Sequence, residues 1–239
     1  MASILIRPQP ISAISFDLDD TLYDNRPNIL NAEQQLLTWL AEHYPKVAIW
    51  LRDDWLALKH ALIKQTPSLA HDTSAVRLAL LQAGLRRFGY SQTEAKQGAK
   101  AGLACFLEHR SNFLVSDEVI AILTQLAERF PLVGITNGNV DANRIGLGEL
   151  LTFVLHPGNG VRMKPYGDLF FKAADRLSIE NAQLVHVGDS YRADVQGARR
   201  AGCQAAWLNP AFGAVTSDIG DGLLPHLQLS SLDELLHLL

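Results

Sequence analysis

The chain has 239 residues, of which 48% are hydrophobic and 19% are charged, so it can bury a substantial core. Its formal net charge is −4 and its pI is about 6.0. It has no basic stripe of the kind that marks a nucleic-acid-binding protein, so nucleic acid is excluded from the expected partners.

No segment approaches the roughly 20 apolar residues that a helix needs to cross a bilayer, and residues 4–6 are too short for the apolar region of a signal peptide. Cys105 and Cys203 lack the spacing of a zinc site, and we expect both to be free thiols. The sequence therefore predicts a soluble, cytoplasmic protein without membrane contact. Both a monomer and a homodimer remain open.

Residues 1–10 contain two prolines and are expected to form a loose lead-in. A first buried strand is predicted over 11–16, because its apolar and β-branched residues suit a parallel sheet. From 28 to about 109, leucines and tryptophans recur at helical spacing, with breaks at two prolines and a Gly-Tyr-Ser turn. This pattern predicts about four helices with no strand among them.

After residue 112 the pattern alternates between helix and strand. Ser116 is expected to cap a helix that Pro131 stops. Further strands are predicted at 132–136, 153–155, 183–187, 204–208 and 227–229, the first four each after a helical stretch, with a short final helix at 232–238. This alternation predicts an α/β fold with a doubly wound parallel sheet, and the all-helical stretch predicts an insertion. We expect a core of residues 1–24 and 113–239 and a helical cap of 25–112.

Polar residues follow several of the predicted strands, and ligands of open α/β sheets bind at such strand ends. The residues in question are Asp17, Asp19, Asp20 and Thr21; Thr136, Asn137 and Gly138; Arg162 and Lys164; and Gly188, Asp189, Ser190 and Asp194. Carboxylates from neighbouring strands repel one another unless a hard cation separates them, and Mg²⁺ suits oxygen ligands that also meet a phosphate. Asp17 and Asp189 are the expected ligands.

The same edge would carry groups that suit a phosphate ester. Thr136, the amide after it and Lys164 offer hydrogen-bond donors and a positive charge. One carboxylate could then attack phosphorus to give an aspartyl-phosphate, while a second moves protons.

Each of these residues also has a purely structural interpretation. Residues 136–138 alone form a turn, Lys164 could be solvated, and Asp194 could cap the next helix. Asp20 is expected to stabilise the turn into the cap. The convergence of four polar groups on one sheet edge favours the functional interpretation.

Four segments resemble the motifs of the haloacid dehalogenase-like hydrolase superfamily. They are Asp17-Leu18-Asp19-Asp20-Thr21-Leu22, Ile135-Thr136-Asn137-Gly138, Lys164-Pro165, and Gly188-Asp189-Ser190 with Asp194. The resemblance covers the whole core, and its first and fourth motifs are specific. It implies a Rossmann-like core with an inserted helical cap of the C1 type.

The resemblance also implies roles for individual residues. Asp17 would be the nucleophile and a Mg²⁺ ligand. Asp19 would act as general acid and then general base, with its backbone carbonyl on the metal.

The remaining motif residues would bind the phosphoryl group and the metal. Thr136 and the amide of Asn137 would hold the phosphoryl group, and Lys164 would neutralise both it and the nucleophile. Asp189 would bind Mg²⁺ directly, and Asp194 would support the metal site.

These roles describe a Mg²⁺-dependent phosphatase that hydrolyses small phosphomonoesters. A 2-haloacid dehalogenase is disfavoured, because it resembles this chain but lacks an acid at the position of Asp19, since halide leaves without a proton. Two non-enzymatic alternatives are a receiver domain of a signalling relay, which lacks the helical insertion, and a catalytically silent ligand-binding relative. The second is disfavoured because every expected catalytic position is occupied.

The segments 22–27 and 223–226 resemble a bacterial branch that hydrolyses flavin mononucleotide and the riboflavin precursor 5-amino-6-(5-phospho-D-ribitylamino)uracil. A sugar-phosphate or nucleotide phosphatase is the alternative. Trp39, Trp50 and Trp55 could stack on a flavin ring or belong to the core of the cap.

Overall fold

The computed structural model describes residues 3–212 and 222–238. The chain forms two compact units, which we call the core unit and the helical unit. The core unit comprises the residues up to Asn25, Phe113–Gly138, and those from Ala142 onward. The helical unit comprises Arg26–Asn112 and Asn139–Asp141.

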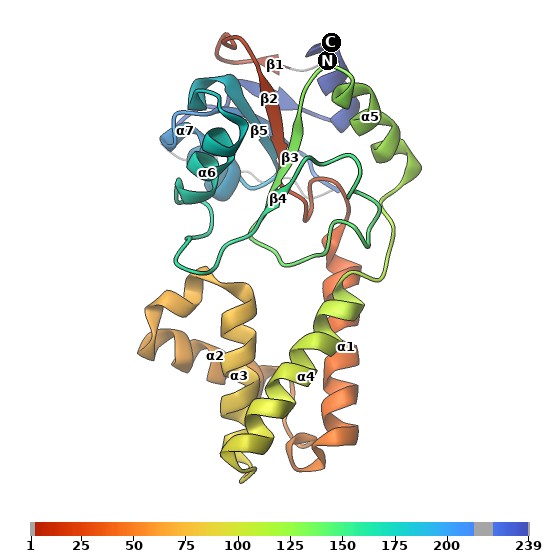
Figure 1. The fold of residues 1–239 in the computed structure, drawn as a ribbon, viewed down its shortest axis with the longest axis vertical. Coiled ribbons are helices and arrows are strands. Elements are labelled where there is room, and N and C mark those ends of the chain that lie inside the picture. The colour runs from red at the N-terminus through yellow and green to blue at the C-terminus, as the bar shows by residue number, and fades with distance from the viewer. Residues whose placement is uncertain (1–2, 213–221, 239) are drawn as a thin grey trace. The chain divides into compact units, whose positions relative to one another are not determined.

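The core unit is built on a mostly parallel sheet, which confirms the predicted α/β fold (Figure 1). Its described strands are β1 (Ser3–Ile4), β2 (Ala13–Phe16), β3 (Leu132–Ile135), β4 (Val154–Leu155), β5 (Leu184–Gly188), β6 (Gln204–Leu208) and β7 (Leu227–Leu229). They lie in the order β1-β7-β6-β5-β2-β3-β4. Every neighbouring pair is parallel except β1 and β7, which are antiparallel.

Every residue of the central strands β2, β3, β5 and β6 is buried. This follows from their near-continuous apolar sequences, which suit a sheet covered on both faces. The helices α6 (Asp168–Leu177) and α7 (Gly197–Arg200) cover one face, and α5 (Asp117–Ala127) covers the other (Figure 1). Short elements complete the unit: η3 (Asn181–Gln183), the π-helix η4 (Tyr191–Gln196) and the 3₁₀-helix η5 (Leu232–Leu238). Ser116 caps α5 as expected, because its Oγ accepts a hydrogen bond from Val119 N at 3.5 Å.

Two expectations about the core unit were wrong in detail. The lead-in is not entirely loose, because β1 pairs with the outer edge of β7 and thereby covers backbone groups that would otherwise be exposed. No α-helix lies between β3 and β4, where the fully described residues 136–153 form turns, with Gly146 at a φ of 87°. The short final helix predicted at 232–238 is confirmed, and it has 3₁₀ geometry.

The helical unit contains the four predicted α-helices in its described residues, with short 3₁₀-helices at the prolines. The elements are α1 (Asn25–His43), η1 (Pro45–Val47), α2 (Arg52–Gln65), η2 (Pro67–His71), α3 (Thr73–Arg87) and α4 (Gln92–Arg110). Ser91 and Glu94 form a capping box at the start of α4, and the Asp72 carboxylate caps α3. Leucines at helical spacing, including Leu36, Leu81 and Leu85, make the unit's own core with Phe106.

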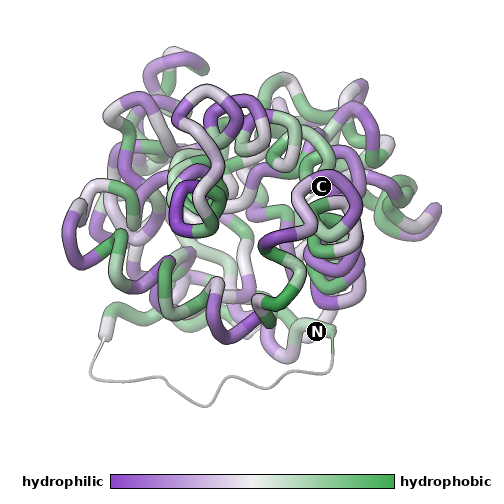
Figure 2. Tube along the Cα trace, turned by 90° about the horizontal axis from the view of Figure 1, so that it is seen from below, coloured by the Kyte–Doolittle hydropathy of each residue, from purple (hydrophilic) through white to green (hydrophobic). Residues whose placement is uncertain are grey.

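Among the described residues, no helix is both long and apolar enough to cross a membrane. Figure 2 shows hydrophilic residues interrupting the hydrophobic ones along the chain.

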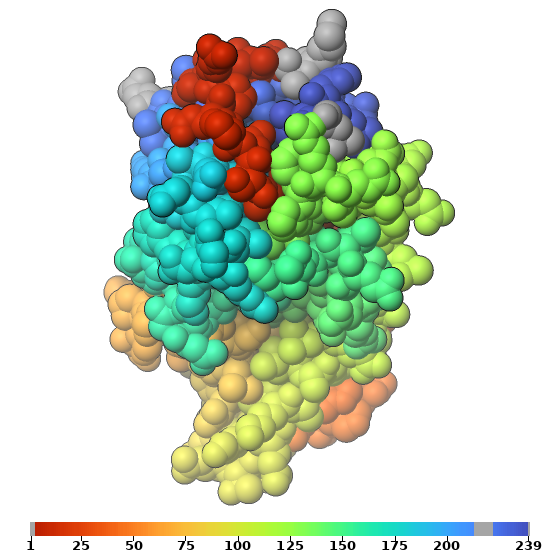
Figure 3. Space-filling view, turned by 45° about the horizontal axis from the view of Figure 1, so that its top comes forward, coloured from red at the N-terminus to blue at the C-terminus, as the bar shows by residue number. Residues whose placement is uncertain are grey.

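In the space-filling view, the red N-terminal residues lie between green residues near α5 and cyan residues before β5 (Figure 3). Two backbone hydrogen bonds hold them there, from Ser12 N to Gln183 O at 2.9 Å and from Ile14 N to Pro131 O at 3.1 Å.

Candidate active site

The carboxyl ends of three adjacent strands bring together residues that are far apart in the sequence. β2 lies between β5 and β3, and Phe16 is in register with both Val187 and Gly134. Because the three strands are parallel, the residues that follow them meet at one edge of the sheet. Asp17 directly follows β2, Thr136 directly follows β3, and Asp189 directly follows β5.

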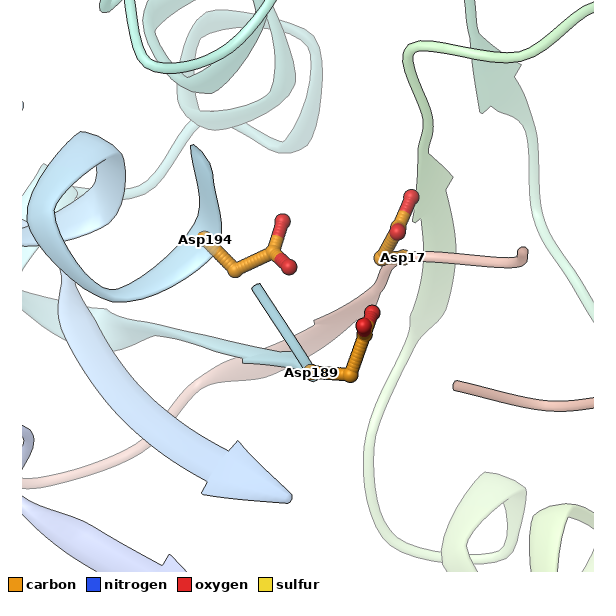
Figure 4. Close-up of side chains that lie close together, drawn as sticks. All are labelled: Asp17, Asp189 and Asp194. Atoms are coloured by element: carbon orange, nitrogen blue, oxygen red, sulfur yellow. The ribbon is translucent and has the colours of Figure 1, made fainter. Parts of the chain in front are cut away.

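Three carboxylates point toward a common space at this edge (Figure 4). One oxygen each of Asp17, Asp189 and Asp194 lies within 4.8 Å of the others, the one such group found among the described residues. Gly188 permits this arrangement, because a Cβ at that position would collide with the Asp194 carboxylate. Ser190 N donates to Asp194 Oδ2 at 2.9 Å and fixes the carboxylate at the start of η4.

Lys164 lies beside two of these carboxylates, and its side chain is only 1% exposed. Its ammonium nitrogen is 2.9 Å from Asp17 Oδ1 and 2.7 Å from Asp194 Oδ1. It also donates to Ile135 O at 2.6 Å. Asn137 holds the lysine backbone at both ends: Lys164 N donates to Asn137 Oδ1 at 2.7 Å, and Asn137 Nδ2 donates to Lys164 O at 2.9 Å.

Burial and mutual repulsion set the charges of the acidic cluster. Burial raises the pKa of Asp17 to about 8 although Lys164 opposes the shift, and burial together with Asp194 raises the pKa of Asp189 to about 6. Burial also acts on Asp194, but Lys164 and His186 outweigh it and hold the Asp194 pKa well below its usual value. Burial would lower the pKa of Lys164, but the carboxylates of Asp17 and Asp194 outweigh it and raise that pKa. The charge of one ammonium does not neutralise three carboxylates, so neighbouring carboxylates add to the effect of burial in raising the pKa values of Asp17 and Asp189.

The donor set fits a hard divalent cation. All three cluster side chains offer carboxylate oxygens, the ligands that Mg²⁺ prefers. Asp17 Oδ1 is buried, and among the described residues no hydrogen-bond donor is aligned with it, although the ammonium of Lys164 lies within ion-pair distance. A buried oxygen in this state is suited to a cation.

Asp19 lies at the same edge of the sheet, but near Tyr23 and Gly138 and outside the group of three carboxylates. Tyr23 donates a hydrogen bond from its hydroxyl to Asp19 Oδ1 at 2.5 Å. A Cβ on Gly138 would lie 2.5 Å from Asp19 Oδ2, so the glycine lets the carboxylate approach the turn after β3. The side chain of Asp19 does not belong to the three-carboxylate group. The chain leaves strand geometry after Phe16, so strand alternation alone did not decide where Asp19 points.

Hydroxyl and backbone groups complete the edge. Thr136 is fully buried, and its Oγ1 accepts from Gly138 N at 3.0 Å, which shapes the turn. Thr21 Oγ1 donates to Asp189 Oδ1 at 3.1 Å and orients that carboxylate. Asp20 accepts from Asn25 N at 2.9 Å at the start of α1, which confirms its expected place in the turn out of β2.

Other residues singled out in the sequence lie outside this cluster. Arg162 forms an ion pair with Asp168, with a 2.8 Å contact between Nη2 and Oδ1. In the helical unit, Trp50 and Trp55 meet edge to face, with ring centroids 4.9 Å apart, and Trp39 stacks on His43. These contacts place the three tryptophans against other aromatic rings of their own unit.

Sequence reasoning did not identify Tyr23, Ser15 or His186 as residues of this region. Tyr23 is four positions after Asp19, a spacing that carries no recognisable signal by itself. Ser15 and His186 are polar residues inside otherwise apolar strands, and this break in the apolar pattern is a signal in the sequence that points to both.

Comparisons with known proteins agree with this geometry. Residues 11–202 match the family described as haloacid dehalogenase-like hydrolase. The 5-amino-6-(5-phospho-D-ribitylamino)uracil phosphatase YigB of Escherichia coli K12 is 39% identical over 229 residues, which cover 96% of each chain. The N-acylneuraminate-9-phosphatase of Mus musculus is 25% identical over 240 residues, covering 94% of this chain and 92% of the relative. The crystal structure of a 2-haloacid dehalogenase from Pseudomonas syringae pv. Tomato DC3000 superposes with a TM-score of 0.86 at 36% identity, covering 94% of this chain and 96% of that one.

Proposed function

Because the chain belongs to the haloacid dehalogenase-like hydrolase family and is a phosphatase, we propose that it hydrolyses small phosphomonoesters with Mg²⁺ through an aspartyl-phosphate. The observation that carries this proposal is the group of three carboxylates with Lys164 beside two of them. Phosphoryl transfer depends mostly on positioning and charge stabilisation, which such a group supplies.

Mg²⁺ would be held by the carboxylates of Asp17 and Asp189 and the backbone carbonyl of Asp19, with Asp194 supporting the site. Bound there, it would supply positive charge for the phosphate oxygens. Lys164 contributes the second positive charge from its buried position between Asp17 and Asp194. Thr136 and the amide of Asn137 hold the remaining phosphoryl oxygens.

The two chemical steps use Asp17 and Asp19. In the first, Asp17 attacks phosphorus, the bond from phosphorus to the alcohol oxygen breaks, and Asp19 gives that oxygen its proton. In the second, water attacks the phosphorus of the aspartyl-phosphate, Asp19 takes a proton from the water, and phosphate leaves as the Asp17 carboxylate re-forms. The Tyr23 hydroxyl, which donates to Asp19 Oδ1, holds this acid in place.

Asp19 also bears on the choice between phosphatase and dehalogenase. An alcohol needs a proton to leave, whereas a halide does not, so a carboxyl group at Asp19 serves phosphate esters. The solved relative named as a 2-haloacid dehalogenase shares the fold of this chain. The named phosphatase relatives and the chemistry of Asp19 together favour phosphate esters.

For the substrate, we propose 5-amino-6-(5-phospho-D-ribitylamino)uracil, with flavin mononucleotide as a related ester. The support is the YigB relative, which matches the chain at 39% identity. The helical unit would act as a C1-type cap over 25–112 that selects the substrate. The alternative is a sugar phosphate or a nucleotide, and the N-acylneuraminate-9-phosphatase relative favours the former.

A phosphate-release screen would test this proposal. The purified protein with Mg²⁺ is assayed against p-nitrophenyl phosphate, 5-amino-6-(5-phospho-D-ribitylamino)uracil, flavin mononucleotide, nucleotides and sugar phosphates, each matched with a chelated control. We expect metal-dependent release throughout and the highest kcat/KM for the ribitylaminouracil ester. A higher kcat/KM for a sugar phosphate would refute the substrate, and release of halide from 2-haloacids without release of phosphate would refute the reaction.

A further inference from the structure

A buried polar pair lies directly beneath the acidic cluster. Ser15 on β2 and His186 on β5 are register partners in adjacent parallel strands, and each is fully buried. Ser15 Oγ lies 2.9 Å from His186 Nδ1. On the other side of the ring, His186 Nε2 lies 3.2 Å from Asp194 Oδ1 and 3.4 Å from Lys164 Nζ. The pair therefore connects the middle of the sheet to the site.

The contacts of His186 Nε2 bear on which nitrogen of the ring carries hydrogen. Nε2 lies 3.2 Å from Asp194 Oδ1 and 3.4 Å from Lys164 Nζ, so the contact with the carboxylate is the shorter of the two. A carboxylate oxygen can only accept a hydrogen bond, so the proton of this contact must come from the imidazole. We therefore assign the ring proton to Nε2, which donates it to Asp194 Oδ1.

Ser15 is then required to donate to the other ring nitrogen. A neutral imidazole with its proton on Nε2 accepts at Nδ1, and the serine hydroxyl has one proton to give. The distance to Nδ1 is 2.9 Å, while the competing acceptor Val185 O is 3.4 Å away. The hydrogen bonds thus run in one direction, from Ser15 to His186 to Asp194.

We propose that Ser15 and His186 are positioning residues, which hold Asp194, and through it Lys164, in place for phosphoryl transfer. This inference rests on the proposed phosphatase function. Asp194 Oδ2 is already fixed by Ser190 N, and the imidazole fixes Oδ1. Without that donor, the carboxylate can turn toward Lys164 alone and draw the ammonium away from Asp17. Outer partners of metal-site ligands act in the same way on ligand orientation.

Two substitutions of His186 separate hydrogen bonding from packing. The imidazole meets the ring of Phe170 edge to face, with centroids 5.0 Å apart. His186→Phe keeps a ring there but has no donor, whereas His186→Gln loses the ring but keeps an amide donor for Asp194. We expect His186→Phe to lower kcat by about tenfold or more. His186→Gln should retain more of the wild-type kcat although it packs less well.

A third substitution and a matched control complete the set. Ser15→Ala removes the donor at Nδ1 and is expected to lower kcat less than His186→Phe does. His226 is also a buried histidine and directly precedes β7, but its ring contacts Ala205 N at 3.1 Å and Arg199 Nη1 at 3.1 Å. His226→Gln should therefore leave kcat near the wild-type value at a temperature where all variants are folded.

Nitrogen-15 NMR of the metal-free protein gives a readout that does not depend on activity. We expect the His186 spectrum to show a protonated Nε2 and an unprotonated Nδ1. A protonated Nδ1 would overturn the proposal. An unchanged kcat in His186→Phe, or a higher kcat in that variant than in His186→Gln, would also overturn it and assign the ring to packing alone.

These outcomes differ from a failure of the proposed function. If the wild type releases no phosphate from any ester, the phosphatase function fails and the positioning role fails with it. If the wild type is active and Ser15→Ala changes neither kcat nor the His186 nitrogen signals, the positioning role fails alone. The serine variant removes only one oxygen atom, so it keeps this test available if His186→Phe does not fold.

Discussion

Lys164 Nζ lies 2.7 Å from Asp194 Oδ1, and the side chains of both residues are only 1% exposed. The lysine also reaches Asp17 Oδ1, so a single buried cation faces two carboxylates. Breaking such a group is costly, because the remaining charges stay buried without a partner.

Lys164→Met should destabilise the core unit and abolish phosphate release. Removing one partner of a buried ion pair typically costs about 3–5 kcal/mol, and here two carboxylates lose their cation. The free energy of unfolding of the metal-free protein, measured with urea, checks the cost. Lys172→Met changes an exposed lysine of α6 and should differ little from the wild type. A Lys164→Met protein as stable as the wild type would show that the buried charges do not depend on the lysine.

Asp17→Asn should stop turnover while leaving the fold intact. The variant loses the proposed nucleophile, but it replaces a buried carboxyl group whose pKa is raised to about 8 with a neutral amide of similar size, and Lys164 keeps Asp194 as its partner. We expect phosphate release at background level and a melting temperature of the metal-free protein at least as high as that of the wild type. Full activity of this variant would assign the attack to another group.

Asp19→Asn should slow the enzyme according to the leaving group. General acid catalysis typically contributes about 10²–10⁴-fold, and it matters most when the departing oxygen is strongly basic. We expect a large loss for alkyl phosphates and a small one for p-nitrophenyl phosphate in the first chemical step. Rapid-mixing kinetics of alcohol release can measure both. An equal loss for the two esters would contradict the acid role.

Mg²⁺ should raise the melting temperature, because it would neutralise the repulsion among Asp17, Asp189 and Asp194. At about 100 times its Kd, a ligand that binds only the folded state contributes about 2.7 kcal/mol. Asp189→Asn should reduce this rise. Asp168→Asn is the matched control, since Asp168 pairs with Arg162 outside the cluster. An equal rise in melting temperature in the two variants would show that the cation binds outside the group of three carboxylates.

We expect acid to lower the free energy of unfolding, because His226 takes up a proton more readily in the unfolded chain than in the folded protein. Burial, followed by the nearby charge of Arg199, lowers its pKa from 6.5 to about 4 in the folded protein. Between these values the unfolded chain takes up a proton that the folded chain does not, so the free energy of unfolding falls as the pH falls from 6.5 to 4. Above this range His226 is neutral in both states and adds no pH dependence. His226→Gln should make the fall smaller in urea titrations at successive pH values, and an identical fall would contradict the assignment.

Much of the fold could be predicted from periodicity and from strand length. The strand at Gln204–Leu208 was predicted with its observed bounds, and the four helices of residues 26–112 followed from leucine spacing. The segment before β4 was predicted as helical and is not. Local apolar spacing does not report turns that glycine and asparagine impose, as at Gly146.

The sequence by itself determined which residue types could do chemistry and that they would follow parallel strands. The tertiary structure decided their contacts: Asp17, Asp189 and Asp194 gather around a common space, while Asp19 turns away to meet Tyr23. It also revealed that Ser15 and His186 touch across two strands separated by more than a hundred residues of chain. The physical reason is that periodicity reports which side of an element a residue occupies, whereas contacts depend on strand order, register and the point at which each strand ends.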